Sequence, residues 1–384
     1  MRHQATMSIL PYILTLPSFN NYGGLLQAYA LQHTLRQLGT SSKQFCFLPR
    51  GMREWFDSLG KRFKLKCWKN LVKIIAGSRS QQLHLYLEAR FFTLFRELFM
   101  NIYRLDAQRS QLRQLADNCR FIVGSDQVWR CEYSRPSESV PFFFLSFASQ
   151  AQRQRSIAYA ASFGSDEWEG TPEETAECTR LLKDFKAVSV REHSGIRLCR
   201  EVFGVDAVQM PDPTLLLEPA DYSRIIRRWW TLRLPKPCMA VYLLDETEEK
   251  KRLTQSVAEQ SGLYPQQLTA HGDAPRAMDR IPLSIPQWLR CIRDSECVLT
   301  DSFHGCVFAI IFNKPFVCLG NASRGSARFD SLLGTFGLQE RLLINPTPEQ
   351  VANLMRNPID WEQVNAIRSS EKQRALQFLK ENLE

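Results

Sequence analysis

Short apolar runs alternate with amphipathic stretches along most of the chain. The run SILPYILTL (8–16) is followed by the polar turn PSFNNYGG (17–24) and by LLQAYALQHTLRQLG (25–39), whose apolar residues fall on one helical face. Gly39 is placed to end this helix. Because a strand, a glycine-containing turn and a helix open a βαβ unit, the pattern predicts an α/β protein.

The same alternation continues over the rest of the chain and divides it in two. Further strands are predicted at 43–48, 120–129, 155–164, 186–192, 206–212, 238–244, 296–300 and 314–320. The pattern loosens through 218–237, where we place a domain boundary. We therefore predict two Rossmann-like doubly wound domains that face a cleft. Their predicted extents are 1–220, with a helical insertion near 54–104, then 235–360, and a closing helix over 361–384.

The composition is that of a folded globular protein. Apolar residues make up 44% and charged residues 23% of 384 positions, a length sufficient for two cores. No apolar run approaches the roughly 18–20 residues of a membrane-spanning helix, so we expect a cytoplasmic protein. The 11 cysteines are scattered without a CxxC pair, which favours reduced, buried thiols over disulfides.

The chain carries a formal charge of +9, and part of the excess lies in 61–99. Such a charge is compatible with a phosphate-bearing ligand, nucleic acid or an anionic membrane surface. In 61–99 the basic residues alternate with apolar ones at helical spacing, which fits either a basic amphipathic helix on a membrane or a helical hairpin packed on the core. The basic residues are spread out without stacking aromatics between them, which argues against a nucleic-acid-binding module.

Polar residues cluster directly after the predicted strands, where an open α/β sheet builds its binding site. Asn21 and Gly23 follow the first strand, Arg191 and Glu192 end another, and Gly-Ser-Asp-Gln (124–127) follows a third. The amides of such turns suit a phosphate group or sugar hydroxyls. Their spacing matches neither G-x-G-x-x-G nor a P-loop, and each turn taken alone is compatible with a structural role.

The stretch TDSFHGCVFAII (300–311) places an acid, two hydroxyls and a histidine between apolar runs. Asp301 or Ser302 is placed to cap the helix that follows, with His304 in its first turn. The positive end of the helix dipole disfavours imidazolium, so we expect a neutral His304 that acts as a general base or proton shuttle. The structural alternative is a core histidine bonded to a backbone carbonyl. No His or Cys set has zinc-site spacing, so no metal is predicted.

Six segments, taken in chain order, resemble the polysaccharide pyruvyl transferase family. They are NYGGLLQAYALQHTLRQLG (21–39), FIVGSDQVW (121–129), IAYAASFG (157–164), VSVREHSG (188–195), DPTLLL (212–217) and TDSFHGCVFAIIFNKPFV (300–317). The resemblance implies a GT-B-like fold and the transfer of pyruvate from phosphoenolpyruvate, a co-substrate, to a saccharide as a ketal, with no other cofactor. It also implies an acceptor for cell-envelope, capsular or exopolysaccharide biosynthesis, often lipid-linked at the inner face of the cell membrane.

The resemblance also implies roles for individual residues. His304 matches the family's proposed acid/base histidine, with Asp301 beside it as a second catalytic candidate. Arg191, in SVRE, matches an arginine that binds phosphoenolpyruvate in the family. Bidentate arginine suits the phosphate and carboxylate of that donor. The expected acceptor-binding residues are Asn21, Gly23, Gly124, Ser125, Asp126 and Gln127.

This chain departs from the family pattern at Ser302. Relatives resemble R-x-H, with the arginine holding the donor, whereas this chain reads S-F-H. We hypothesise that Arg324 or Arg328, on the loop after the next strand, supplies the missing charge. The expected donor-binding residues are therefore Arg191, Ser302, Arg324 and Arg328.

Two other interpretations stay open at this point. A GT-B-like glycosyltransferase could bind the diphosphate of a nucleotide sugar in the same cleft, and a non-enzymatic sugar-binding module could keep the fold without the donor chemistry.

Overall fold

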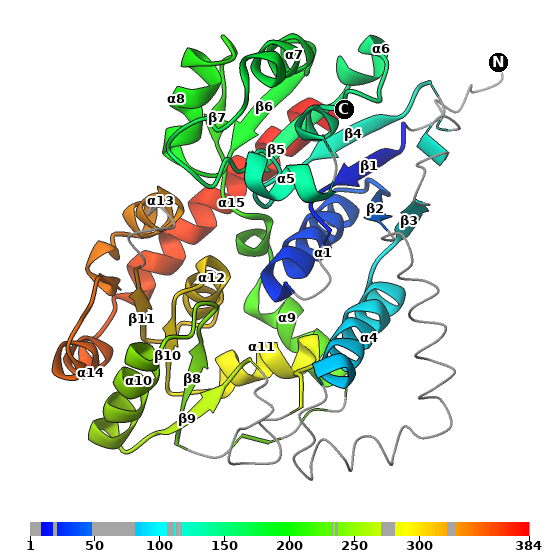
Figure 1. The fold of residues 1–384 in the computed structure, drawn as a ribbon. Coiled ribbons are helices and arrows are strands. Elements are labelled where there is room, and N and C mark those ends of the chain that lie inside the picture. The colour runs from blue at the N-terminus through cyan, green and yellow to red at the C-terminus, as the bar shows by residue number, and fades with distance from the viewer. Residues whose placement is uncertain are drawn as a thin grey trace.

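The fold was analysed in a computed structural model of the chain. It describes residues 9–17, 21–47, 81–105, 111–112, 115, 117–137, 139–229, 231, 233–234, 237–269, 281–320 and 327–383. These residues form two parallel β-sheets flanked by helices, one sheet in each half of the chain (Figure 1). The predicted fold class, α/β with two Rossmann-like doubly wound domains, is confirmed.

The first sheet has the Rossmann strand order with one strand added. Its order is β3-β2-β1-β4-β5-β6-β7, with every pair parallel. The winding reverses between β1 and β4, where Leu14 pairs with Val123. The turns that follow these two strands therefore leave the sheet side by side. The strands are β1 (Pro11–Leu14), β2 (Lys43–Phe47), β3 (Ile102–Leu105), β4 (Arg120–Val123), β5 (Ile157–Ala161), β6 (Ala187–Val190) and β7 (Val208–Gln209).

The second sheet has the other common doubly wound order, β12-β11-β10-β8-β9. Its winding reverses between β8 and β10, where Tyr242 pairs with Thr300. Ligands of open α/β sheets bind beyond the carboxyl ends of the strands at such reversals, so each sheet offers one such point. The strands are β8 (Cys238–Tyr242), β9 (Tyr264–Gln267), β10 (Cys297–Thr300), β11 (Phe316–Leu319) and β12 (Leu342–Leu343).

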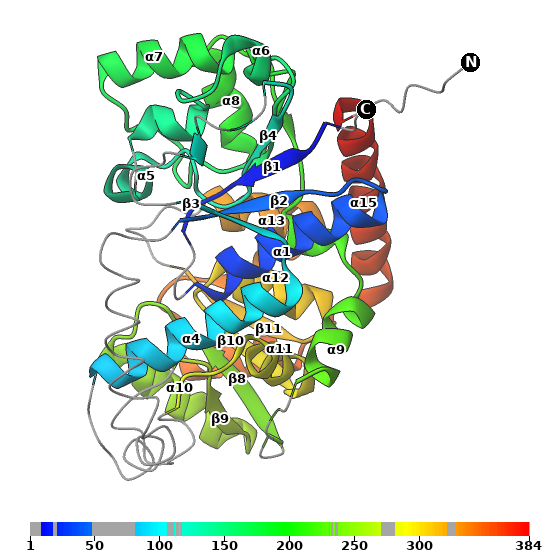
Figure 2. The same cartoon turned by 90° about the vertical axis from the view of Figure 1, so that its right-hand side faces the viewer.

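Helices connect the strands and pack on the sheets (Figures 1 and 2). Thr171 caps α7, because its hydroxyl accepts a hydrogen bond from the amide of Glu174. The helices are α1 (Tyr22–Gln37), α4 (Gln81–Phe99), α5 (Cys131–Ser137), α6 (Gln150–Arg153), α7 (Pro172–Leu182), α8 (His193–Glu201), α9 (Pro219–Arg227), α10 (Glu248–Ser261), α11 (Ile285–Asp294), α12 (Phe303–Ile311), α13 (Ala327–Phe336), α14 (Pro348–Arg356) and α15 (Trp361–Leu383), with the 3₁₀ helices η2 (Val140–Phe144), η3 (Pro213–Leu216) and η5 (Gln339–Arg341).

The last helix, α15, returns from the second half of the chain to the first sheet (Figure 2). Its residues Phe378 and Leu379 are buried with Ile13 of β1 and Tyr159 of β5 in one apolar cluster. Arg120 of β4 donates to the carbonyl of Leu383 at 2.5 Å. The end of the chain is thus part of the core beneath the first sheet.

A shared apolar core also joins the first turn of α1 to the second half. The ring of Tyr22 stacks on Trp288 of α11, with centroids 5.4 Å apart and planes at 9°. The Tyr22 hydroxyl donates to the carbonyl of Leu283 at 2.7 Å, and Phe92 of α4 packs against the same ring. An aromatic pair of this kind adds about 0.5–1.5 kcal/mol to what burial alone contributes. These contacts fix the N-terminus of α1 beside the helices of the second sheet.

Two elements differ from the sequence prediction. Helix α1 begins at Tyr22 rather than at residue 25, because the Asn21 side chain accepts a hydrogen bond from the amide of Gly24 at 2.9 Å and caps the helix there. The insertion was predicted as helical up to residue 104, but Ile102–Leu105 forms the edge strand β3, which pairs with the otherwise open edge of β2. Residues 48–80 of the insertion lie outside the described residues.

The described part of the basic segment packs on the core. Helix α4 buries Phe92 and Phe95 against α1, which fits the core-packed interpretation for 81–99. Ten cysteines lie in the described part, all free thiols and nine of them buried. Burial raises the pKa of the Cys199 thiol to about 12.

Among the described helices, none combines the length and the apolarity that a membrane span needs.

Candidate functional site

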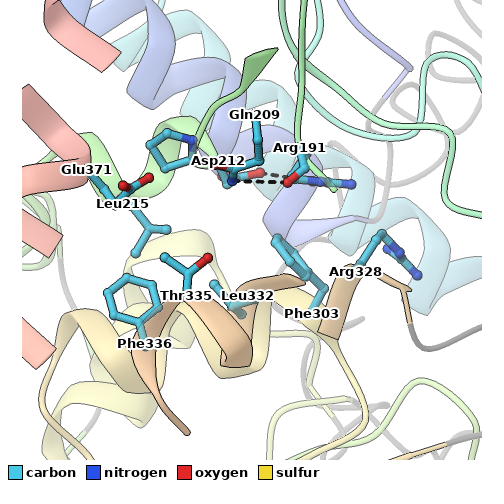
Figure 3. Close-up of a pocket in the computed structure, with 11 residues that line it drawn as sticks. Arg191, Gln209, Asp212, Leu215, Phe303, Arg328, Leu332, Thr335, Phe336 and Glu371 are labelled. Atoms are coloured by element: carbon cyan, nitrogen blue, oxygen red, sulfur yellow. Dashed lines mark hydrogen bonds and ion pairs between the residues drawn. The ribbon is translucent and has the colours of Figure 1, made fainter. Parts of the chain in front are cut away.

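A cavity of about 210 Å³ lies where the reversal points of the two sheets meet. Asn21, Asp126 and Gln127 line it from the first half of the chain. Asp301, Ser302 and His304 line it from the second half, from the turn after β10 and the first turn of α12. The remaining lining residues are Tyr133, Leu244, Asp245, Phe303, Arg328 and Phe329. A smaller space of about 20 Å³ shares Phe303 and Arg328 with it and continues toward Arg191 and Asp212 (Figure 3).

The turn after β10 is folded tightly so that His304 enters the first turn of α12. The hydroxyl of Thr300 donates to the carbonyl of Tyr242 at 2.7 Å and accepts from the amide of Ser302 at 3.0 Å. A Cβ at Gly305 would overlap with this hydroxyl, so glycine is needed after His304. Ser302 takes the N-cap position, but its side chain makes no capping hydrogen bond, and Asp301 does not cap either. The predicted side-chain cap is therefore wrong.

Groups of the first half of the chain hold the imidazole of His304 from two sides. A Cβ at Gly23 would overlap with the ring, so α1 approaches the imidazole as closely as it does only because residue 23 is glycine. On the other side, Nε2 lies 3.5 Å from Oδ2 of Asp212. Nε2 is buried and has no hydrogen-bond partner among the described residues.

Asp212 also binds Arg191. One carboxylate therefore contacts both Arg191 and His304, the two residues that were predicted from the sequence. Nη1 of Arg191 donates to Oδ2 of Asp212 at 2.9 Å, and both side chains are buried (Figure 3). Burial alone would raise the pKa of the Asp212 carboxyl, but His304 and Arg191 hold that pKa well below its usual range. Asp212 is therefore ionised at neutral pH.

Phe303 lies between two guanidinium groups. Arg191 lies over its ring at 4.5 Å from the centroid, and Arg328, in the first turn of α13, at 6.0 Å (Figure 3). Burial and the neighbouring charge of Arg191 lower the pKa of Arg328 to about 10, so it stays cationic at neutral pH. Cation–π contact with Phe303 offsets part of the repulsion between the two arginines. Two positive charges thus lie next to Phe303, which lines both the larger cavity and the smaller space.

The side chain of Asp301 is occupied by the neighbouring loop of the second domain. Its carboxylate accepts from the amides of Leu244 and Asp245 at 2.6 and 3.1 Å. It also forms an ion pair with Lys250 at 2.6 Å. These contacts tie the turn after β10 to the turn after β8, a structural function that the sequence did not suggest. A catalytic function of Asp301 stays a prediction.

The turn after β4 divides into a part that lies away from the cavity and a part that lines it. Ser125 is fully buried: its amide donates to Gln27, its carbonyl accepts from Thr15, and its hydroxyl donates to the carbonyl of Ala160. Gly124 lies beneath it with φ +116°, against the backbone of Tyr159. Neither residue lines the cavity, whereas Asp126 and Gln127 do.

The structure brings most of the predicted site residues together. Asn21, Asp126, Gln127, Asp301, Ser302, His304 and Arg328 line the larger cavity, and Arg191 lines the smaller one. Gly23 packs on His304, Gly124 and Ser125 support the turn from below, and Arg324 lies outside the described residues.

Sequence reasoning missed Asp212 and Phe303. Both lie in the quoted family segments DPTLLL and TDSFHGCV, which was the only available signal. In the described ranges, no three His, Cys, Asp or Glu side chains form a group that could hold a metal ion.

Comparison with known proteins gives one family. A model of the polysaccharide pyruvyl transferase family matches residues 21–323, and no curated protein matches the chain. Among solved structures, the spinosyn forosaminyltransferase SpnP is 14% identical, covers 95% of each chain and has a TM-score of 0.39. MurG of Acinetobacter baumannii is 10% identical, covers 97% of this chain and 98% of its own, and has a TM-score of 0.43. At these identities and TM-scores, the similarity to the two solved structures carries no information on the substrate.

Proposed function

The chain belongs to the polysaccharide pyruvyl transferase family, and from this premise we propose that it moves pyruvate from phosphoenolpyruvate to a saccharide as a ketal. The acceptor is a cell-envelope, capsular or exopolysaccharide precursor, free or lipid-linked. One observation carries the proposal. Two arginines, Arg191 and Arg328, lie over the ring of Phe303; Arg328 and Phe303 line the cavity that His304 also lines, and Arg191 lines the smaller space beside it.

The charges suit a donor that carries both a phosphate and a carboxylate. In Arg191, Nε and Nη2 are buried without a hydrogen-bond partner among the described residues, and Nη2 lies 3.9 Å from Oδ1 of Asp126, so both nitrogens can donate to a bound anion. The first turn of α12 has no side-chain cap, and its amides favour negative charge. A small residue, Ser302, leaves this helix end open where relatives have arginine. Arg328 supplies the second charge over the same Phe303 ring.

The proposed reaction balances without any oxidant or reductant. Two hydroxyl oxygens of the sugar form bonds to C2 of phosphoenolpyruvate, while the bond from C2 to the phosphate oxygen breaks. Of the two hydroxyl protons, one ends on C3, which becomes a methyl group, and the other leaves on phosphate. His304 is the group placed to move the proton at C3, and general acid–base catalysis of this kind contributes about 10²–10⁴-fold.

The opposite side of the cavity suits the hydroxyls of an uncharged sugar. Asn21 and Gln127 offer amide groups, and Asp126 offers a carboxylate that can accept from a hydroxyl. Leu244, which is 51% exposed, and Tyr133 add apolar surface at the same cavity. A few convergent polar groups on a partly apolar wall are typical of small-molecule sites.

The test is to incubate the protein with phosphoenolpyruvate and a panel of free and lipid-linked saccharides. We expect phosphate release only when both substrates are present, and a product whose mass has increased by one pyruvate ketal. Thermal stabilisation by a nucleotide sugar, with none by phosphoenolpyruvate and no ketal, would instead indicate a glycosyltransferase. Binding of a saccharide without turnover of either donor would indicate a sugar-binding module.

A further inference from the structure

The hydroxyl of Ser331 links the two arginines of the proposed donor site. Ser331 lies on α13 at position i+3 from Arg328, so the two side chains lie on the same side of the helix. Its hydroxyl donates a long hydrogen bond, 3.5 Å, to the carbonyl oxygen of Arg191 in the first half of the chain. Ser331 is buried and is not among the residues that line either cavity. A residue one turn from one arginine therefore contacts the backbone of the other.

A second, shorter contact joins Ser331 to the first half of the chain. Nδ1 of His193, the first residue of α8, lies 2.7 Å from the hydroxyl oxygen of Ser331. A hydroxyl can accept one hydrogen bond while it donates another, so Ser331 can bind the imidazole and the Arg191 carbonyl at the same time. Helices α8 and α13, one from each half of the chain, are thus joined through one oxygen atom.

The backbone on which both partners of this hydroxyl lie is held firmly. Glu192 separates Arg191 from His193 in the chain, and its side chain is buried. Oε1 of Glu192 accepts from the amides of Phe163 and Gly164, in the turn after β5, at 2.6 and 2.9 Å. Buried hydrogen bonds of this kind cost free energy to break. The first half of the chain therefore offers α13 a fixed point of attachment.

This link opposes the repulsion between the two arginines. The guanidinium groups of Arg191 and Arg328 lie over the same Phe303 ring, at 4.5 and 6.0 Å from its centroid (Figure 3). Like charges repel more strongly inside a protein than in water, which favours a wider spacing until an anion binds to both. Apolar packing holds α13 through residues such as Leu333, but it is non-directional. A hydrogen bond has a preferred length, so it can set the spacing.

We propose that Ser331 and His193 are positioning residues that set the spacing of the two arginines, so that both arginines bind one donor molecule. The identity of that donor rests on the proposed function. Residue 302 is a serine, and the second positive charge comes from Arg328 on α13 instead of from α12. The affinity for a donor with a phosphate and a carboxylate therefore depends on how α13 is held against the first half of the chain.

The first arm of the test measures the Kd for phosphoenolpyruvate by calorimetry, without a saccharide. Ser331→Ala and His193→Ala should each raise this Kd by about 2–10-fold, which corresponds to the loss of one hydrogen bond. The matched control is Ser194→Ala on α8, because the Ser194 hydroxyl is also buried but has no hydrogen-bond partner among the described residues. The control should leave the Kd unchanged. An unchanged Kd in both Ser331→Ala and His193→Ala would overturn the proposal.

The second arm distinguishes positioning from a general loss of structure. The double variant Arg328→Ala, Ser331→Ala should bind phosphoenolpyruvate within about twofold of Arg328→Ala, because no arginine on α13 is left for Ser331 to position. A further loss as large as that caused by Ser331→Ala in the wild type would show that Ser331 acts independently of Arg328, which contradicts the proposal. His193→Ala, at an exposed residue, enters the same cycle if Ser331→Ala does not fold.

Inorganic phosphate is the second probe, for the case in which the wild type does not bind phosphoenolpyruvate. The proposed function then fails, but the same cycle with phosphate still decides this inference. A loss of phosphate affinity in Ser331→Ala that disappears in the Arg328→Ala background would support it. No effect of Ser331→Ala, or no binding of either anion to the wild type, would overturn it.

Discussion

Two turns face each other across the cavity, and they use their polar residues in opposite ways. In the turn after β4, the amide, carbonyl and hydroxyl of Ser125 all have partners inside the protein. After β10, Nε2 of His304 is buried and has no hydrogen-bond partner among the described residues, whereas the carboxylate of Asp301 has partners, as Ser125 does. A polar residue at a strand end is therefore a candidate for chemistry when the fold leaves part of its hydrogen-bonding capacity unused.

The largest expected effect on activity comes from His304, whose Nε2 has no hydrogen-bond partner among the described residues. His304→Gln should lower kcat for ketal formation by about 10²–10⁴-fold, because the amide cannot transfer a proton at neutral pH. Phosphate release in the presence of both substrates measures this. The control, His33→Gln, changes a half-buried histidine that contacts Tyr29 and should retain activity. A His304→Gln enzyme within threefold of the wild type would remove His304 from the mechanism.

The next effect is on donor binding. Arg328→Ala should raise KM for phosphoenolpyruvate by about 10–100-fold, which corresponds to the loss of one charged hydrogen bond. Arg200→Ala, an exposed arginine on α8, removes the same charge away from the cavity and should leave KM unchanged. Equal KM values for Arg328→Ala and the wild type would exclude Arg328 as the replacement for the charge missing at Ser302.

Asp301, whose carboxylate already has partners inside the protein, should affect stability rather than donor binding. Asp301→Asn loses the ion pair with Lys250 and weakens two hydrogen bonds to amides, so we expect the free energy of unfolding to fall by about 1–3 kcal/mol. Urea unfolding measures this loss, and the KM for phosphoenolpyruvate of the folded protein should change little. A loss of kcat as large as that of His304→Gln, at unchanged stability, would instead support the predicted catalytic function of Asp301.

The smallest effect concerns a carboxyl whose burial is not offset by a partner of opposite charge in the part of the chain that the structure describes. Burial raises the pKa of Glu88, on α4, to about 7. The folded state then keeps a proton that the unfolded chain releases near pH 4.3, so the free energy of unfolding falls as pH rises between about 4.3 and 7.

We therefore expect Glu88→Gln to be more stable than the wild type by about 1 kcal/mol at pH 8, after allowance for partial solvent screening, and equal to it at pH 4. Urea unfolding at the two pH values checks this. A difference that is the same at both pH values would show that the carboxyl does not titrate as its burial implies.

Much of the fold could be predicted from the sequence, because apolar periodicity and capping residues act locally. The strands β1, β4 and β10 are examples. The start of α1 was misplaced because glycines usually mark turns, and only the packing of His304 against Gly23 explains a glycine inside that helix. Local pattern could not show this contact, since the two residues come from different halves of the chain.

The candidate site was predictable in its members but not in their arrangement. The family resemblance pointed to Arg191 and His304, and nothing in the local sequence indicated that Asp212 joins them. The expectation of a neutral His304 considered only its own helix. The carboxylate of Asp212, on a turn distant in the sequence, lies 3.5 Å from Nε2 of His304, and such a contact becomes visible only when the three-dimensional structure is known.

The most direct measurement of the central claim is the reaction itself. Wild-type protein and His304→Gln are each incubated with phosphoenolpyruvate and the saccharide panel, and phosphate and product mass are measured together. The account predicts one phosphate released for each pyruvate ketal formed by the wild type, and at least a hundredfold less of both with His304→Gln, as loss of general acid–base catalysis implies. Phosphate release without a pyruvylated product, or equal yields from the two proteins, would contradict it.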